Sequence, residues 1–127
     1  AREVLGTPFS HQGRVPGLAL DCIGLAIHVA RRAGFEPVDV AGYGPQPHAG
    51  LLEQALDNAE FLEAVALPLP GDILLMRFAD DPQHVAILTG QTIIHSYANA
   101  GKVVEHSYSP IWQARTVRGY RFKGIRP

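Results

Sequence analysis

The second half of this 127-residue chain contains a series of short apolar segments separated by tight turns, and this series most constrains the fold. The segments contain many β-branched and aromatic residues, and most connections between them contain Gly, Asn, Asp or Pro. Their ranges are 73–78, 84–88, 91–97, 102–108 and 117–123. Such runs, joined by short turns, are typical of successive antiparallel strands. We therefore expect an antiparallel sheet over residues 68–127, with a short helix near residues 110–115.

The first half of the chain differs, because its apolar residues recur at helical spacing. Residues 1–20 are rich in turn-forming Gly and Pro and predict an opening loop. One helix is predicted to begin after Asp21, its N-cap, and a second to cover residues 48–67. The acidic residues of the second helix are expected to face solvent; they are Glu53, Asp57, Glu60 and Glu63. A mainly helical segment (21–67) followed by strands indicates one α+β domain over residues 1–127.

Composition and charge argue against several classes of function. The formal net charge is -1, which gives no reason to expect nucleic acid or an anionic membrane as a partner. No apolar run approaches the roughly 20 residues of a membrane span. The single cysteine allows no internal disulfide, so packing must stabilise the fold. The N-terminus lacks a basic-then-apolar secretion signal, so we expect synthesis in the cytoplasm without a signal peptide.

That single cysteine, Cys22, lies in the first turn of the first predicted helix. A lone buried cysteine is usually a small apolar core residue. At a helix start, however, the free N–H groups and the partial positive charge favour thiolate over thiol. The position after a polar loop therefore makes Cys22 a candidate nucleophile, provided that the chain supplies a base for it.

Two histidines on neighbouring predicted strands are the candidate partners. If Thr89 and Gly90 form a two-residue hairpin loop, His84 lies opposite His95, with Cβ atoms about 5 Å apart. A loop longer by two residues would keep both side chains on the same face. A cysteine nucleophile needs a base, and the base needs a third group that fixes its tautomer and orientation. We therefore expect His84 to act on Cys22, with His95 behind it.

Zinc binding is the competing chemistry for this set, because cysteine and histidine are both zinc ligands. The sequence has no close ligand pair of the C-x-x-C or H-x-x-x-H kind, so we expect neither a metal nor a cofactor. The other histidines considered, His28, His48 and His106, are expected to be structural or surface residues.

Taken in order, four motifs resemble those of a known family. They are Asp21-Cys22-x-Gly24-Leu25 on a helix, Pro70-Gly71-Asp72 before a strand, His84-Val85-Ala86-Ile87-x-x-Gly90, and Ile94-His95. This order resembles the NlpC family of cysteine peptidases, and in particular the type found with phage tails and gene-transfer particles. The resemblance covers nearly the whole chain. It implies a minimal papain-like α+β fold, in which the nucleophile's helix packs on a central antiparallel sheet.

The resemblance also implies a reaction and a role for each site residue. The family hydrolyses an amide bond in the stem peptides of bacterial peptidoglycan, typically between D-γ-glutamyl and diaminopimelate or lysine. By position, Cys22 would be the nucleophile, His84 the general base and acid, and His95 the polar third residue. Candidate substrate-binding residues are Asp21, Phe9, His11, Arg14 and Tyr97.

Two positions depart from the family's pattern. Many members have serine directly after the cysteine, where it and the preceding aspartate help to bind a free amine of the substrate. This chain has Ile23 there. The family also tends to place tyrosine in the opening loop, where this chain has Phe9 and therefore no hydroxyl.

The resemblance further implies a setting for the protein. We expect incorporation in the tail of a virion or gene-transfer particle, with other particle proteins as partners and the periplasmic cell wall as the place of action. Basic residues between Arg115 and Arg126 would contact a neighbouring subunit or acidic wall polymers, or be plain surface charge. Two alternatives stay open: an acyltransferase that uses the same Cys-His-His site, and a structural tail component without activity.

Overall fold

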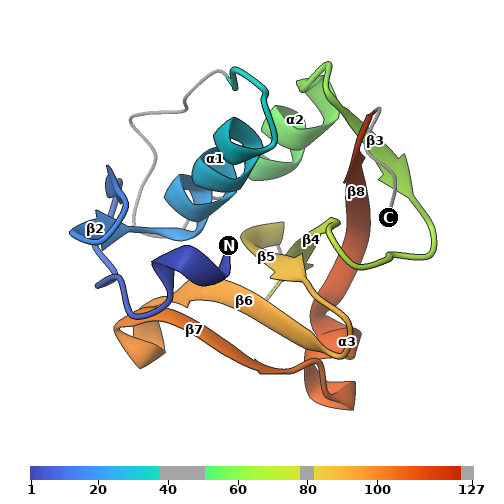
Figure 1. Ribbon diagram of the computed structural model, residues 1–127. Coiled ribbons are helices and arrows are strands. Elements are labelled where there is room, and N and C mark those ends of the chain that lie inside the picture. Colours follow the sequence, from blue (N-terminus) through green and yellow to red (C-terminus); the bar gives the residue numbers. More distant parts are fainter. Residues whose placement is uncertain (38–50, 78–81, 124–127) are drawn as a thin grey trace.

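The computed structural model describes residues 1–37, 51–77 and 82–123, and its main feature is a six-stranded antiparallel sheet (Figure 1). The strand order is β3-β8-β4-β5-β6-β7. Their bounds are β3 Leu62–Val65, β4 Ile73–Arg77, β5 Pro82–Leu88, β6 Thr92–Tyr97, β7 Lys102–Ser107 and β8 Thr116–Phe122. The predicted strands are therefore present, and the α+β prediction is confirmed.

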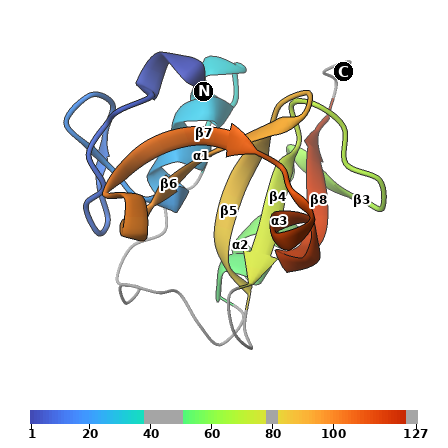
Figure 2. The ribbon, with the colours of Figure 1, turned by 90° about the horizontal axis from the view of Figure 1, so that it is seen from below.

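Helices cover both faces of this sheet. Helix α1 (Cys22–Arg32) packs on β5 and β6, and α2 (Leu51–Asn58) packs on β3 and β5. Beneath them lies the larger apolar core, to which alternate residues such as Ile73, Leu75 and Val85 contribute. The opposite face has a smaller core, covered by Trp112 of α3 (Pro110–Arg115). Figure 2 shows β6 and β7 running at a steep angle to β4, β5 and β8, so the sheet is strongly bent.

The prediction of one long second helix is wrong. Helix α2 ends at Asn58, and Leu62–Val65 form the edge strand β3, paired with β8 from Leu62↔Phe122 to Val65↔Gly119. The reason is long-range packing: Phe61 and Phe122 stack with ring centroids 6.1 Å apart, and Leu62 is buried in the larger core. Tertiary contacts of this kind override a weak helical preference. The start of the predicted helix, residues 48–50, lies outside the described residues.

The opening segment is not a plain loop. It contains a 3-10 turn, η1 (Arg2–Val4), and a small hairpin formed by β1 (Arg14–Val15) and β2 (Ala19–Leu20). This segment is fitted tightly to α1. A Cβ at Gly24 would lie 2.1 Å from the Gly13 carbonyl oxygen, so only glycine allows the loop and the helix to approach this closely.

The hairpin between β5 and β6 has a register two residues away from the predicted one. Leu88 pairs with Ile93 rather than with residue 91, because the Thr89 amide bonds to the Thr92 carbonyl within a longer loop. Since the change is an even number of residues, each side chain keeps its face. Within the described residues, no helix is both long and apolar enough to cross a membrane.

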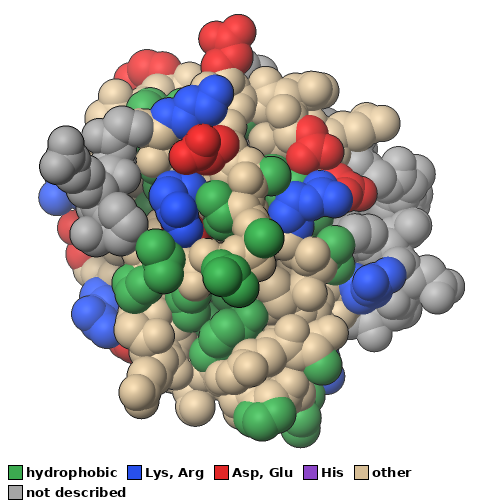
Figure 3. Space-filling view, turned by 90° about the vertical axis from the view of Figure 1, so that its right-hand side faces the viewer, with side chains coloured by type: hydrophobic (Ala, Val, Ile, Leu, Met, Phe, Trp, Pro, Cys, Tyr) green, Lys and Arg blue, Asp and Glu red, His purple; other side chains and the backbone are tan. Residues whose placement is uncertain are grey.

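Charged side chains of opposite sign lie side by side on the face of the molecule that carries β3 and β8 (Figure 3). Arg118 on β8 pairs with Glu53 and, at 3.5 Å, with Asp57. The side chains of Glu53 and Asp57 are 31% and 48% exposed, so both face solvent as expected and also pair with Arg118. Arg121 pairs with the buried carboxylate of Asp72, so two of the C-terminal basic residues have internal partners.

Candidate active site

Cys22 lies at the first position of α1, where the helix start meets β5. Its side chain is buried, and the backbone amide of Val85 on β5 is near enough to lower the pKa of its thiol. This proximity places the sulfur beside the residue that follows His84. The position of the helix start is fixed from the other side by Ser96 on β6, whose Oγ donates a 2.5 Å hydrogen bond to the Leu20 carbonyl.

The amides at the helix start favour the Cys22 thiolate, as expected, but burial outweighs them. Burial, and secondly the negative charge of Asp21, raise the pKa of Cys22 to about 12. The amides of Val85, Ile23 and Cys22 itself lower this pKa, but by less. A thiol with such a pKa is a weak nucleophile at neutral pH, so any reaction at Cys22 requires a group that takes its proton.

The structure brings His84 and His95 together at the end of the smaller core. His84 Nε2 and His95 Nδ1 are 2.7 Å apart, and both side chains are buried. Burial, then the neighbouring His95 and Arg115, hold the pKa of His84 well below its usual value. Burial, then His106, lower the pKa of His95 to about 3. Both rings are therefore neutral at pH 7, and a neutral ring can accept a proton.

A third histidine extends this pair, and sequence reasoning missed it. His106 on β7 was expected to be a structural or surface residue, but its Nε2 lies 2.7 Å from His95 Nε2. The register of β6 and β7 explains the contact: Ile93 pairs with His106, so His106 is the diagonal neighbour of His95 on one face. Continuing the alternation of β6 into β7 would have revealed it. His28 is a structural residue, as expected, with Nε2 2.6 Å from Glu3.

Aromatic rings enclose the row of histidines. Tyr97 stacks on His95 with centroids 5.1 Å apart and lies 6.0 Å from His84. Trp112 meets His95 edge-on at 4.9 Å, and the Arg115 guanidinium lies 4.5 Å from the centre of the Trp112 ring. Tyr97, a predicted substrate-binding residue, is therefore next to the two histidines and only half-buried.

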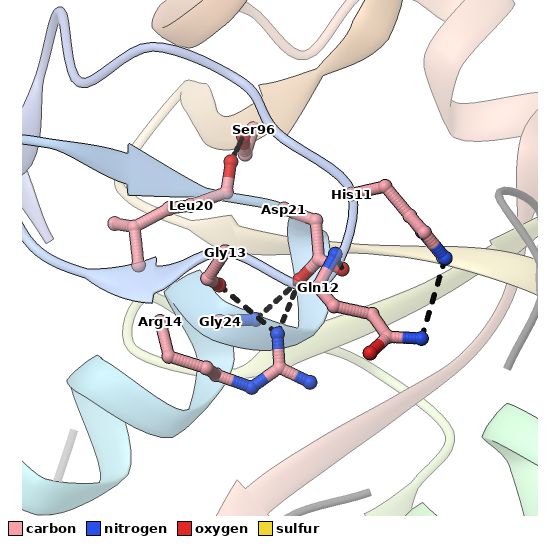
Figure 4. Close-up of polar contacts among 8 residues, drawn as sticks. All are labelled: His11, Gln12, Gly13, Arg14, Leu20, Asp21, Gly24 and Ser96. Carbon is pink, nitrogen blue, oxygen red and sulfur yellow. Dashed lines mark hydrogen bonds and ion pairs between the residues drawn. The ribbon is translucent and has the colours of Figure 1, made fainter. Parts of the chain in front are cut away.

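Asp21 is the centre of a second polar network, which it forms with residues of the opening segment and with Gly24 (Figure 4). Its Oδ1 accepts hydrogen bonds from the Gly24 amide at 2.8 Å and from Arg14 Nη1 at 2.9 Å. Its Oδ2 accepts one from the Gln12 amide at 2.8 Å. The carboxylate is thus both the helix cap and the ion-pair partner of Arg14.

The remaining predicted substrate-binding residues lie around this network. His11 is exposed, and its Nε2 is 3.3 Å from the Gln12 side-chain nitrogen. Phe9 is half-buried at the turn between β6 and β7, where its amide donates to the Gly101 carbonyl. The structure therefore groups His11 and Arg14 with Asp21, and holds Phe9 at a different strand connection.

The described residues contain no group of histidine, cysteine, aspartate and glutamate side chains placed to hold a metal ion. His84 and His95 direct ring nitrogens at each other rather than at a common point. The arrangement instead suits proton transfer to and from a buried thiol.

A helix-start cysteine beside a histidine pair, with that helix packed on a bent antiparallel sheet, defines the papain-like class of α+β folds. The chain belongs to the NlpC/P60 family, whose sequence model matches residues 6–121. The family prediction is thereby confirmed.

One solved structure with the same fold is the NlpC/p60 domain of the peptidoglycan hydrolase SagA, which is 21% identical in sequence. The match has a TM-score of 0.63 and covers 93% of this chain and 89% of that domain. No significant match was found among curated proteins.

Proposed function

We propose that this protein is a cysteine peptidase that hydrolyses an amide bond in peptidoglycan stem peptides, between D-γ-glutamyl and diaminopimelate. The observation that carries the proposal is the placement of Cys22 at a helix start, beside strand β5, whose His84 is bonded to His95 of β6. The substrate class is supported by family membership and by the hydrolase activity named for the SagA domain.

The first half of the reaction forms a thioester. Neutral His84 accepts the thiol proton of Cys22 as the sulfur attacks the carbonyl carbon of the substrate amide. The developing oxyanion is stabilised by the backbone N–H of Cys22, which has no partner within the helix because it lies in the first turn. The His84 imidazolium then gives its proton to the leaving amine as the C–N bond breaks.

The second half releases the acid and restores the enzyme. Water gives a proton to His84 and attacks the thioester carbonyl, and the C–S bond breaks. The proton then returns to the Cys22 sulfur. A thiol with a raised pKa suits the last step, because it retakes its proton readily.

Digestion of isolated cell walls tests this function. Purified protein and the Cys22→Ala variant are incubated with peptidoglycan from several Gram-negative bacteria, and released fragments are identified by mass spectrometry. Fragments cut after D-γ-glutamyl, seen only with intact Cys22, are the expected result. Fragments carrying an added amine would indicate an acyltransferase, and no release from any wall would favour a structural protein.

We further propose that the domain works in the tail of a phage-like or gene-transfer particle and opens the periplasmic wall during penetration. This rests on the resemblance of the motif order to that type. The partners would be other particle proteins. Mass spectrometry of purified particles from the source cells tests this setting; detection only in the soluble, particle-free fraction would contradict it.

A further inference from the structure

His84, His95 and His106 form a continuous row of hydrogen bonds that ends on a backbone carbonyl. The row runs from His84 Nε2 to His95 Nδ1 at 2.7 Å, and from His95 Nε2 to His106 Nε2 at 2.7 Å. At its far end, His106 Nδ1 lies 3.0 Å from the carbonyl oxygen of Ser107. Each of these nitrogens must therefore be either a donor or an acceptor toward a known partner.

The carbonyl sets the direction of the whole row. A carbonyl oxygen only accepts, so His106 Nδ1 carries a hydrogen and, in the neutral ring, His106 Nε2 is an acceptor. His95 must then donate from Nε2 and accept at Nδ1. His84 must in turn donate from Nε2. In the reverse order of neutral rings, His106 Nδ1 would carry no hydrogen, and its lone pair would face the lone pairs of the Ser107 carbonyl oxygen.

We propose that His106 is a positioning residue that fixes the tautomer of His84 for reaction with Cys22. With Nε2 of His84 protonated and bonded to His95, Nδ1 is the only ring nitrogen left with a lone pair. That lone pair is the acceptor for the Cys22 proton. In this scheme His106 neither takes the proton of Cys22 nor contacts the bond that is cleaved in the substrate. It acts only through its hydrogen bond to His95.

The surroundings of the row allow this control. His95 is fully buried and His84 is only 5% exposed, so bulk water does not compete for the ring nitrogens. Trp112 holds two of the rings, with centroids 4.9 Å from His95 and 5.0 Å from His106. Tyr97 stacks on His95 and also contacts Trp112, with ring centroids 5.5 Å apart. The rings therefore cannot easily turn to restore a lost hydrogen bond.

Two substitutions of equal length separate this role from simple packing. Gln in His106→Gln can place an amide oxygen where His106 Nε2 lies and accept from His95. Met in His106→Met fills the same space, but its thioether is only a weak acceptor. In the Met variant, His95 loses the partner for its Nε2 hydrogen. The state with a Cys22 thiolate and a His84 imidazolium, which needs that hydrogen in place, becomes less populated.

The test measures alkylation of Cys22 by iodoacetamide near pH 8, together with ¹⁵N NMR of the histidine rings, in the full chain. Circular dichroism and thermal unfolding establish that each variant is folded. We expect alkylation to fall about tenfold in the Met variant and to stay within about threefold of the parent in the Gln variant. The NMR spectra should show His84 protonated at Nε2 in the parent, and a second tautomer in the Met variant.

Equal alkylation rates in folded parent and Met variant, or a Gln variant as slow as the Met variant, would overturn the proposal. So would a parent spectrum with His84 protonated at Nδ1. The proposal concerns the same cysteine as the proposed peptidase function, but the test uses no cell wall. Failure of the peptidase proposal, seen as intact peptidoglycan, is thus distinct from failure of this one.

Discussion

Cys22 lies between two polar arrays that are built on opposite principles. On the loop side, Asp21 holds a fixed charge and is bonded to Arg14 and to two backbone amides. On the sheet side, His84 and its two partners in the row are bonded ring to ring, and the two buried ones are neutral. The first array is held by an ion pair and by hydrogen bonds to a charged carboxylate. The second is held by hydrogen bonds whose directions depend on which ring nitrogens carry hydrogens.

The difference assigns separate tasks to the two arrays. Asp21 accepts hydrogen bonds from three donors, and its negative charge adds to burial in raising the pKa of Cys22. It can fix the start of α1 but cannot remove the thiol proton of Cys22. The neutral imidazole of His84 can, because one of its ring nitrogens has a lone pair that accepts a proton. The thiol is therefore kept protonated at rest, and in the proposed reaction it is activated from the sheet side alone.

The largest expected effect comes from removing the sheet-side base. His84→Ala leaves a thiol whose pKa is about 12, so peptidoglycan cleavage should fall roughly 10³-fold and alkylation at neutral pH should nearly cease. When alkylation of His84→Ala is measured from pH 6 upward, its rate should rise only at the highest pH values tested. His28→Ala is the matched control, since that ring pairs with Glu3 and lies outside the row. Equal neutral-pH alkylation in His84→Ala and parent would refute the division of tasks.

The next prediction distinguishes the two arrays by how the stability of the protein changes at acidic pH. The folded protein keeps His84 and His95 neutral, with pKa values below that of an unfolded histidine, about 6.5. Between pH 6.5 and 4.5 the unfolded chain therefore binds more protons, and the free energy of unfolding falls as pH falls. The slope approaches about 1.4 kcal/mol per pH unit for each such histidine. Urea unfolding at several pH values measures it.

A variant shows which ring produces the slope. His95→Gln removes one of the two buried imidazoles while retaining a polar side chain of similar length. Its unfolding free energy should depend on pH less steeply, by about one proton, over the same range. An unchanged slope in this variant would mean that His95 is not kept neutral by the fold.

How far the sequence predicts this molecule depends on the range of the interactions involved. The strands can be predicted from alternating apolar residues and turn-forming residues. The prediction that His84 and His95 share a face of the sheet also holds, because the predicted register differs from the observed one by an even number of residues. The strand at Leu62–Val65 is not predictable in this way, because four residues carry little periodic signal and β8 decides their pairing. The protonation of Cys22 likewise depends on burial, which a helix-start argument does not include.

The partner of the Asp21 charge is a further feature that the sequence does not show. The family resemblance implies that Asp21 binds substrate, which stays a prediction. The sequence does not show that the chain folds back so that Arg14, seven positions earlier, occupies the same carboxylate. Together with Ile23 in place of serine, this ion pair makes the loop side of the site a poor receptor for a cationic amine.

The smallest of the three effects tests the loop side directly. In Asp21→Asn the amide can still cap Gly24, but every partner of Asp21 is a donor, so its NH₂ group must face another donor. We expect the free energy of unfolding to fall by roughly 2 kcal/mol. The same change removes the charge that raises the pKa of Cys22, so alkylation should begin at lower pH. A less stable protein with a more reactive thiol is the combined result.

Glu53→Gln is the matched control for this substitution. It also neutralises a carboxylate paired with an arginine, Arg118, but in a pair whose side chains are 31% and 37% exposed. Its cost should stay below about 1 kcal/mol, and Cys22 alkylation should be unchanged, because solvent screens this pair. If Asp21→Asn lost stability without changing the pH at which Cys22 reacts, the loop-side charge would be purely structural. The resting protonation of the thiol would then follow from burial alone.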